Sequence, residues 1–147
     1  MRKFIIAIIF LISTATAAHS QFYAGMGLGA SVTKARFVGE LQIGQILEHN
    51  WFVQGSYQSH IDAEYPALLQ LQGGRRFMGS GAHKYKGMSV SGGYCYQLVS
   101  SDNTARNKNT FVVSAAVFKH RRVGELVYSG TFSPGYFILG VGLRGLF

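Results

Sequence analysis

The chain has 147 residues, of which 48% are hydrophobic, 14% aromatic and 14% charged, and its formal net charge is +8. This composition is too apolar for a disordered chain, and its 19 glycines with few charged residues are untypical of a helical protein. The single cysteine, Cys95, excludes an intramolecular disulfide, and we expect it to be a buried, inert thiol.

The first 20 residues are predicted to be a cleaved secretory signal peptide. Two basic residues precede an apolar run over 4–12, and small residues follow it. This run is shorter than the roughly 20 residues that a membrane-spanning helix needs. Small-x-small sites allow cleavage after Ala17 or after Ser20, and the second site predicts a mature domain over 21–147.

The basic surplus has a different meaning in an exported chain than in a cytosolic one. Removal of the signal peptide takes 2 of the 14 basic residues and leaves 12 against 6 acidic residues, a net charge of +6. We expect anionic lipid head groups as the counter-charge, and no nucleic acid partner.

Eight strands follow in chain order, each predicted from apolar residues that alternate with small or polar ones. The sixth is the least regular because Val112, Ala116 and Phe118 lie on its polar face, and the seventh has few apolar residues. The register of each of these two strands therefore stays open by one residue. The strands are placed at 22–32, 36–47, 50–60, 67–78, 85–99, 109–119, 123–132 and 136–147.

These strands have the length and the aromatic pattern of a membrane barrel. A strand that crosses a bilayer needs about 9–11 residues. Aromatic residues gather near the strand ends, as in the interfacial girdles of such barrels. They are Phe22, Tyr23, Trp51, Phe52, Phe77, Tyr85, Phe132, Tyr136, Phe137 and Phe147. The sequence therefore predicts an all-β, eight-stranded antiparallel up-and-down transmembrane barrel with its apolar face outward.

The polar face of the predicted barrel carries four ionic residues that we expect inside, Glu40, Arg76, Glu125 and Arg144. An eight-stranded barrel is narrow enough for side chains to fill it, so it would not conduct large solutes. Because a buried charge needs a partner, we predict at least one Glu–Arg contact in the interior. The alternative is that these residues lie unpaired at the wet ends of the strands.

The last strand resembles the terminal strand of Gram-negative outer-membrane barrels, which ends on an aromatic residue after alternating apolar ones. Leu139, Val141, Leu143 and Phe147 match that pattern, whereas Gly145 occupies one apolar position. The resemblance implies that the outer-membrane assembly machinery reads this strand, which then closes the barrel against the first.

Length and layout resemble the small OmpA/OmpX-type barrels across the whole mature chain. This resemblance implies a location in the outer membrane of a Gram-negative bacterium, in contact with its lipid and lipopolysaccharide. It also implies a non-enzymatic protein that acts through its surface loops, in envelope structure or in contact with an envelope protein.

Two alternatives remain. The segments "NWFVQGSYQ" and "GGYCYQLVSSDNTARNKNTFVV" resemble TraO-type conjugal transfer proteins. That resemblance implies an accessory role in a conjugation or secretion apparatus, with Arg106 and Lys108 in the loop over 100–109 as the contact surface. The other alternative is a soluble, lipocalin-like barrel, which predicts an aliphatic interior that binds a small apolar ligand.

The sequence predicts no enzyme. Ser59, His60 and Asp62 form the most suggestive cluster, but neighbours on a strand point to opposite faces, which favours a polar loop edge. No histidine has a second ligand at metal-binding spacing, and no glycine-rich segment lies between a strand and a helix as phosphate binding requires. We therefore expect no catalytic residue, no metal and no cofactor.

Overall fold

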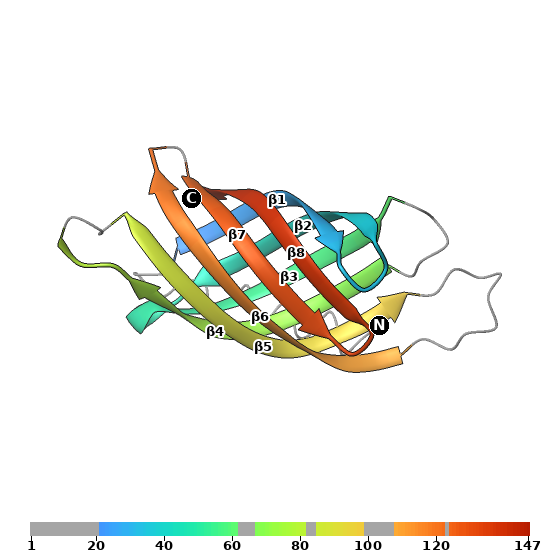
Figure 1. Ribbon diagram of the computed structural model, residues 1–147. Helices are drawn as coiled ribbons and strands as arrows, with labels where there is room; N and C mark the ends of the chain where they lie inside the picture. The colour runs from blue at the N-terminus through green and yellow to red at the C-terminus, as the bar shows by residue number, and fades with distance from the viewer. Residues whose placement is uncertain (1–20, 62–66, 82–84, 99–107, 123) are drawn as a thin grey trace.

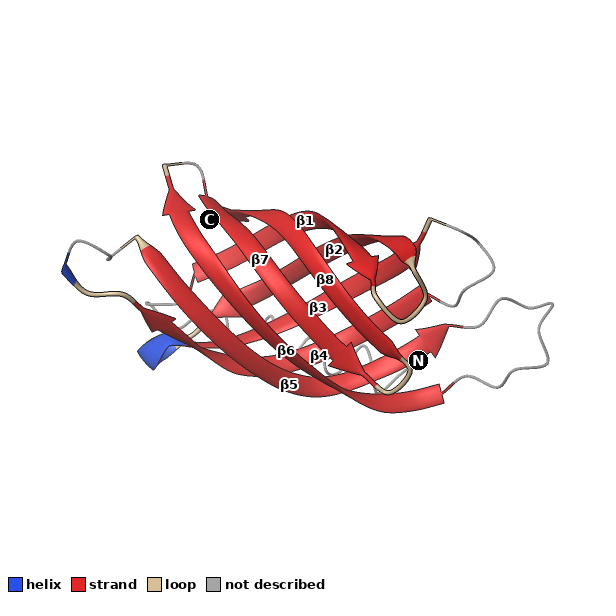
Figure 2. Ribbon diagram, viewed as in Figure 1, coloured by secondary structure: helices blue, strands red, loops and turns tan. Residues whose placement is uncertain are grey.

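The computed structural model describes residues 21–61, 67–81, 85–98, 108–122 and 124–147. The predicted signal peptide and Arg106 lie outside these residues. Eight antiparallel strands, each hydrogen-bonded to the next in chain order, close into one barrel (Figures 1 and 2). The strands are β1 (Gln21–Ser31), β2 (Arg36–Ile46), β3 (Trp51–His60), β4 (Ala67–Met78), β5 (Lys86–Leu98), β6 (Lys108–Arg121), β7 (Gly124–Ser133) and β8 (Tyr136–Leu146).

The predicted all-β fold with eight antiparallel strands is confirmed. Each observed strand boundary lies within two residues of the predicted one, although the predicted ends at 99 and 123 lie outside the described residues. No helix within the described ranges is long and apolar enough to cross a membrane. A short helical turn, η2 (Glu48–Asn50), lies between β2 and β3.

The last strand closes the barrel against the first. Tyr23 lies opposite Leu146 and Ser31 opposite Ile138 in the β1–β8 ladder. The ladder is extended by a backbone hydrogen bond of 2.9 Å from the Phe147 nitrogen to the Phe22 oxygen. The closed sheet has no free strand edge, so the backbone polar groups of every strand have neighbours on both sides.

The two ends of the barrel differ in what they carry. The terminal end is where β1 begins and β8 ends, and it carries the β2–β3, β4–β5 and β6–β7 connections (Figure 1). The distal end holds the other four connections. One of these is the tight β7–β8 turn, where Pro134 precedes Gly135 at φ 88°, the arrangement of a type II turn.

The distribution of polar and apolar side chains is inverted relative to that of a soluble protein. Among the described residues, 17 buried side chains are polar or charged, and only 11 are apolar. Large apolar side chains point outward instead: Met26 is 66% exposed, Leu28 65% and Leu143 62%. Successive residues on a strand point to opposite faces, so the alternation in the sequence separates the apolar wall from the polar interior.

Apolar side chains return to the interior near both ends. The distal apolar layer consists of Val38, Leu68, Cys95, Val112, Tyr136 and Ile138. The terminal apolar layer consists of Tyr23, Ile46 and Phe52, with Leu146 packed against them. Most of the buried polar side chains lie between the two layers, whereas Ser31, His60 and Ser133 lie level with the distal one, so the barrel is filled along its length.

Two details of the sequence interpretation change. The irregularity of the sixth strand reflects these interior contacts, since Val112 belongs to the distal layer and Phe118 is 3% exposed inside the barrel. The assignment of Tyr23, Phe52 and Tyr136 to the outer aromatic girdle is wrong, because all three are buried in the interior. Each has an outward aromatic or apolar neighbour in sequence, and strand alternation sends only one of the two outward.

Candidate functional site in the barrel interior and on its wall

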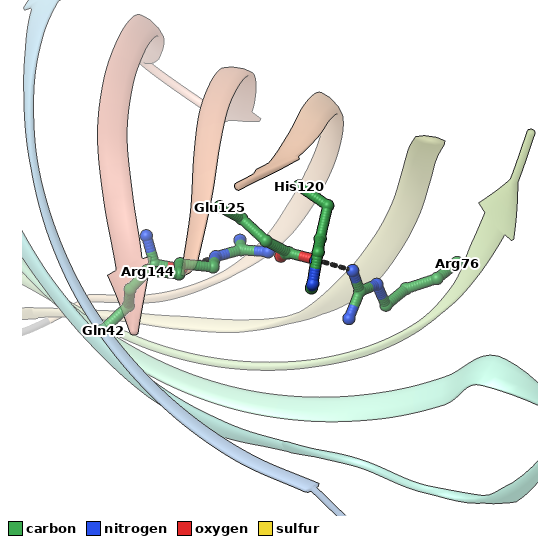
Figure 3. A network of polar contacts seen from close by, with 5 residues as sticks. All are labelled: Gln42, Arg76, His120, Glu125 and Arg144. Atoms are coloured by element: carbon green, nitrogen blue, oxygen red, sulfur yellow. Dashed lines mark hydrogen bonds and ion pairs between the residues drawn. The ribbon is translucent and has the colours of Figure 1, made fainter. Parts of the chain in front are cut away.

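An ion pair crosses the interior near the terminal end. The Arg76 Nη2 atom on β4 donates to the Glu125 Oε1 atom on β7, and the two side chains are 7% and 1% exposed (Figure 3). The Nδ1 atom of His120, on β6, lies 3.5 Å from the same carboxylate oxygen. Strands β4 and β7 are not neighbours, so this contact joins opposite parts of the wall.

The second interior arginine is held by a neutral partner. Arg144 donates from Nε to the Gln42 Oε1 atom at 2.9 Å, as Figure 3 shows. Its guanidinium carbon lies 4.9 Å from the centre of the Tyr23 ring, and that of Arg76 lies 4.3 Å from the Phe118 ring. Both arginines therefore combine a hydrogen bond with a cation–π contact, which compensates part of the cost of burying a charge.

Glu40 faces the same interior but has different partners. It is half-buried and lies opposite Gln58 in the β2–β3 ladder. Glu40 and Arg144 both line a polar cavity of about 20 Å³ in the middle of the barrel. A cavity of this volume has room for about one water molecule. Of the four ionic residues expected inside, the structure brings Arg76 and Glu125 into contact.

A chain of glutamines links β3, β4 and β5 through the interior. Gln72 donates to Gln70 at 2.7 Å, and Gln70 donates to Gln58 at 2.8 Å. Ser91 donates its hydroxyl to Gln72 at 2.6 Å. The sequence places these glutamines on one face of their strands, but which of them touch depends on the stagger between strands. The amide groups satisfy one another where water is excluded.

The outer face of β8 carries the predicted assembly residues. Leu139, Val141 and Leu143 point outward and are 44–62% exposed, and Phe147 is 80% exposed beside β1. The predicted loop contacts are placed only in part. Lys108 begins β6 at the distal end, and Arg106 lies outside the described residues.

The described residues contain no arrangement suited to catalysis at Ser59. His60 is 5% exposed in the interior and stacks at 5.7 Å on Tyr136, whereas Ser59 is only partly buried and donates to the His60 backbone oxygen. Asp62 lies outside the described residues. In the described part of the chain, no three His, Cys, Asp or Glu side chains are grouped so that they could hold a metal ion.

Comparison with known proteins finds similar structures. No protein-family model matches the chain. No curated protein sequence matches it either. A designed transmembrane β-barrel matches with a TM-score of 0.69 and 12% identity, over 86% of this chain and 95% of that one.

Two natural barrels match over the same 86% of this chain. The N-terminal β-barrel domain of OprF from Pseudomonas aeruginosa has a TM-score of 0.66 and 16% identity, over 97% of its own chain. The outer membrane protein Ail of Yersinia pestis has a TM-score of 0.56 and 13% identity, over 99% of its chain. At these identities the likeness is one of fold. The fold is that of the small OmpA/OmpX-type barrels, as predicted, and the resemblance to TraO-type proteins finds no support.

Proposed function

We propose that the chain is a non-enzymatic outer-membrane β-barrel protein that acts through its surface loops, in envelope structure or in contact with an envelope partner. The observation that carries this proposal is that apolar side chains cover the outside of the barrel while charged side chains are buried inside it. Outward residues such as Met26 and Leu143 are more than 60% exposed, while Arg76 and Glu125 are buried. A soluble protein would place such apolar side chains in contact with water, whereas a bilayer is their matching solvent.

The content of the interior argues against a soluble, ligand-binding barrel. A lipocalin-like barrel needs an apolar cavity, whereas the interior cavity lined by Gln42, Gln54 and Arg144 is polar and measures about 20 Å³. The apolar layers at both ends are occupied by the protein's own side chains. A filled interior also favours a barrel that does not conduct large solutes.

The proposed orientation has the terminal end in the periplasm. A chain that reaches the outer membrane from the periplasm, with the start of β1 and the end of β8 on the periplasmic side, would expose its distal connections at the cell surface. The outward wall would then contact outer-membrane lipid, and lipopolysaccharide near the distal end. In this proposal the assembly machinery reads Leu139, Val141, Leu143 and Phe147 on β8.

Fractionation of the native host, followed by gel electrophoresis of unheated and boiled samples, tests the proposal. We expect the protein in the outer-membrane fraction, with an unheated band that migrates faster than the boiled one because the closed barrel resists detergent. A soluble periplasmic or secreted product without this shift would contradict the proposal. Planar-bilayer recording of the purified barrel should show no large, stable conductance.

Cysteine labelling tests the orientation separately. In a Cys95→Ser background, Lys34→Cys lies in the distal β1–β2 turn and Glu48→Cys in the terminal β2–β3 turn. A membrane-impermeant maleimide added to intact cells should label the first variant and spare the second. The reverse pattern would show that the terminal end faces the outside.

A further inference from the structure

Three exposed basic side chains lie together on the outer wall at the terminal end. Lys86 begins β5, and Lys119 and Arg121 lie near the end of the neighbouring strand β6. Lys119 and Arg121 are two residues apart, so they share the outward face of β6 with Val117. We call these three residues the basic rim cluster.

The pairing of the two strands brings like charges directly opposite each other. Lys86 is the register partner of Lys119, and Arg121 follows Lys119 on the same outward face of β6. Like charges at opposite positions in a sheet destabilise it unless a counter-charge is present. The three residues thus concentrate positive charge on a small area of wall.

The described part of the protein supplies no such counter-charge. None of the described residues forms an ion pair with Lys86, Lys119 or Arg121. Three acidic residues are described. Glu40 and Glu125 face the interior, and Glu48 lies in the turn between β2 and β3, where the described residues give it no ion pair with the cluster. An anion from outside the chain would remove the repulsion.

The cluster continues directly into the apolar wall. The next outward pair toward the middle of the barrel is Met88 with Val117, which are 50% and 54% exposed. A molecule with acyl chains on these two residues would bring its phosphate to Lys86 and Lys119. At the same end, the Arg75 guanidinium lies 5.7 Å from both the Trp51 and Phe77 rings, which places aromatic and basic groups together as at a membrane–water boundary.

We propose that the basic rim cluster binds the phosphate group of an anionic phospholipid, such as phosphatidylglycerol, in the leaflet at the terminal end of the barrel. This inference rests on the proposed membrane function. A phospholipid fits better than a protein partner because the cluster lies on the wall, in continuity with the apolar band. Lysine and arginine near an anionic membrane surface are attracted to it, and each contributes independently.

Native mass spectrometry of the purified full chain, refolded in detergent, tests the proposal. The chain is incubated with an equal mixture of phosphatidylglycerol and phosphatidylcholine that have the same acyl chains, and the bound lipid is counted. We expect wild type to retain phosphatidylglycerol preferentially. Lys119→Gln should lower this preference roughly fivefold, and the triple variant K86Q/K119Q/R121Q should lose it. The matched control K34Q/R36Q, at the distal end, should keep it.

Several outcomes of this experiment would overturn the proposal. Equal retention of the two lipids by wild type, or an unchanged preference in the triple variant, would overturn the assignment. In a second incubation with an equal mixture of phosphatidylglycerol and lipid A, stronger retention of lipid A by wild type than by the triple variant would also overturn it. Every variant is first checked for the heat-sensitive gel shift. A shifted band without lipid preference contradicts this inference alone, whereas wild type without the shift contradicts the membrane function itself.

Discussion

Arg76 and Glu125 form an ion pair across the barrel although they lie 49 residues apart in the sequence and on strands that are not neighbours. The pair is almost completely buried, and His120 approaches the same carboxylate from β6. Among the described residues, the Arg76 Nε and Glu125 Oε2 atoms have no hydrogen-bond partner. The pair therefore joins two halves of the wall, while part of its desolvation cost stays uncompensated.

Loss of one partner should destabilise the barrel strongly. Glu125→Gln leaves Arg76 buried without its counter-charge, and we expect the free energy of unfolding to fall by about 3–5 kcal/mol. Urea unfolding of the barrel in lipid vesicles measures this change. The control Glu48→Gln removes a carboxylate from an exposed turn and should change the free energy of unfolding by less than about 0.5 kcal/mol. Equal effects of the two variants would contradict the role assigned to the pair.

Replacement of both partners should be far milder than loss of one. Because the pair is only partly satisfied, the double variant R76L/E125L exchanges a costly desolvated contact for apolar packing. We expect its free energy of unfolding to lie closer to wild type than that of Glu125→Gln, in the same urea measurement. A double variant as unstable as the sum of two single variants would show that each residue stabilises the barrel on its own.

Two adjacent glycines on β5 should respond differently to the same substitution. A Cβ atom at Gly93 would overlap the Leu71 carbonyl oxygen and lie 2.8 Å from the Gln72 Cα atom, because β4 and β5 approach closely on the inner face. Gly93→Ala should therefore destabilise the barrel by about 1–3 kcal/mol. Gly92→Ala is the matched control, since its Cβ would meet no atom closer than 3.7 Å, the Val112 oxygen. Equal melting temperatures for the two variants would contradict this account.

A charge on the wall should be costly only where the wall lies deep in a bilayer. Met26, at the middle of β1, is 66% exposed, and Val32, just beyond the distal end of β1, is 57% exposed. In a membrane, Met26→Arg should destabilise by about 2–4 kcal/mol and Val32→Arg by at most about 1 kcal/mol. A soluble barrel would tolerate both, so equal unfolding free energies for the two variants would count against the membrane location.

The terminal aromatic residue should affect assembly more than stability. Phe147 is 80% exposed, and its contact with β1 is a backbone hydrogen bond that any residue can form. Phe147→Ala should lower the amount of heat-sensitive barrel in the outer membrane while it changes the unfolding free energy of refolded protein by less than about 0.5 kcal/mol. Phe132→Ala, an outward aromatic residue on β7, is the control and should assemble normally. Normal assembly of Phe147→Ala would show that the aromatic ring of Phe147 is not part of the proposed assembly signal on β8.

Strand positions could be predicted from the sequence because side chains on a strand alternate between two faces with a period of two. The apolar Met26 and the small Gly27, for example, can be assigned to the outer and inner faces without knowledge of the fold. Contacts across the interior could not. Glu40 and Glu125 both face inward, as do Arg76 and Arg144, and only the stagger of eight tilted strands decides that Arg76 meets Glu125.

The interior apolar layers could not be predicted from the sequence, for a related reason. On its own strand Val112 is an apolar residue on a polar face, and only the closed barrel brings it together with Val38 and Leu68. The terminal cation–π contact of Arg76 with Phe118 joins β4 to β6 in the same way. The sequence pattern of a single strand cannot predict contacts that form only when all eight strands are assembled into the barrel.

The β1–β8 seam joins residues that lie far apart in the sequence. It pairs Tyr23 with Leu146 and bonds the Phe147 backbone to that of Phe22. Until these two strands meet, the sheet keeps two unpaired edges on which another chain can add a strand, and pairing between residues so distant in sequence is slow. Closure of the ring is therefore the step that removes the last template for aggregation from the sheet.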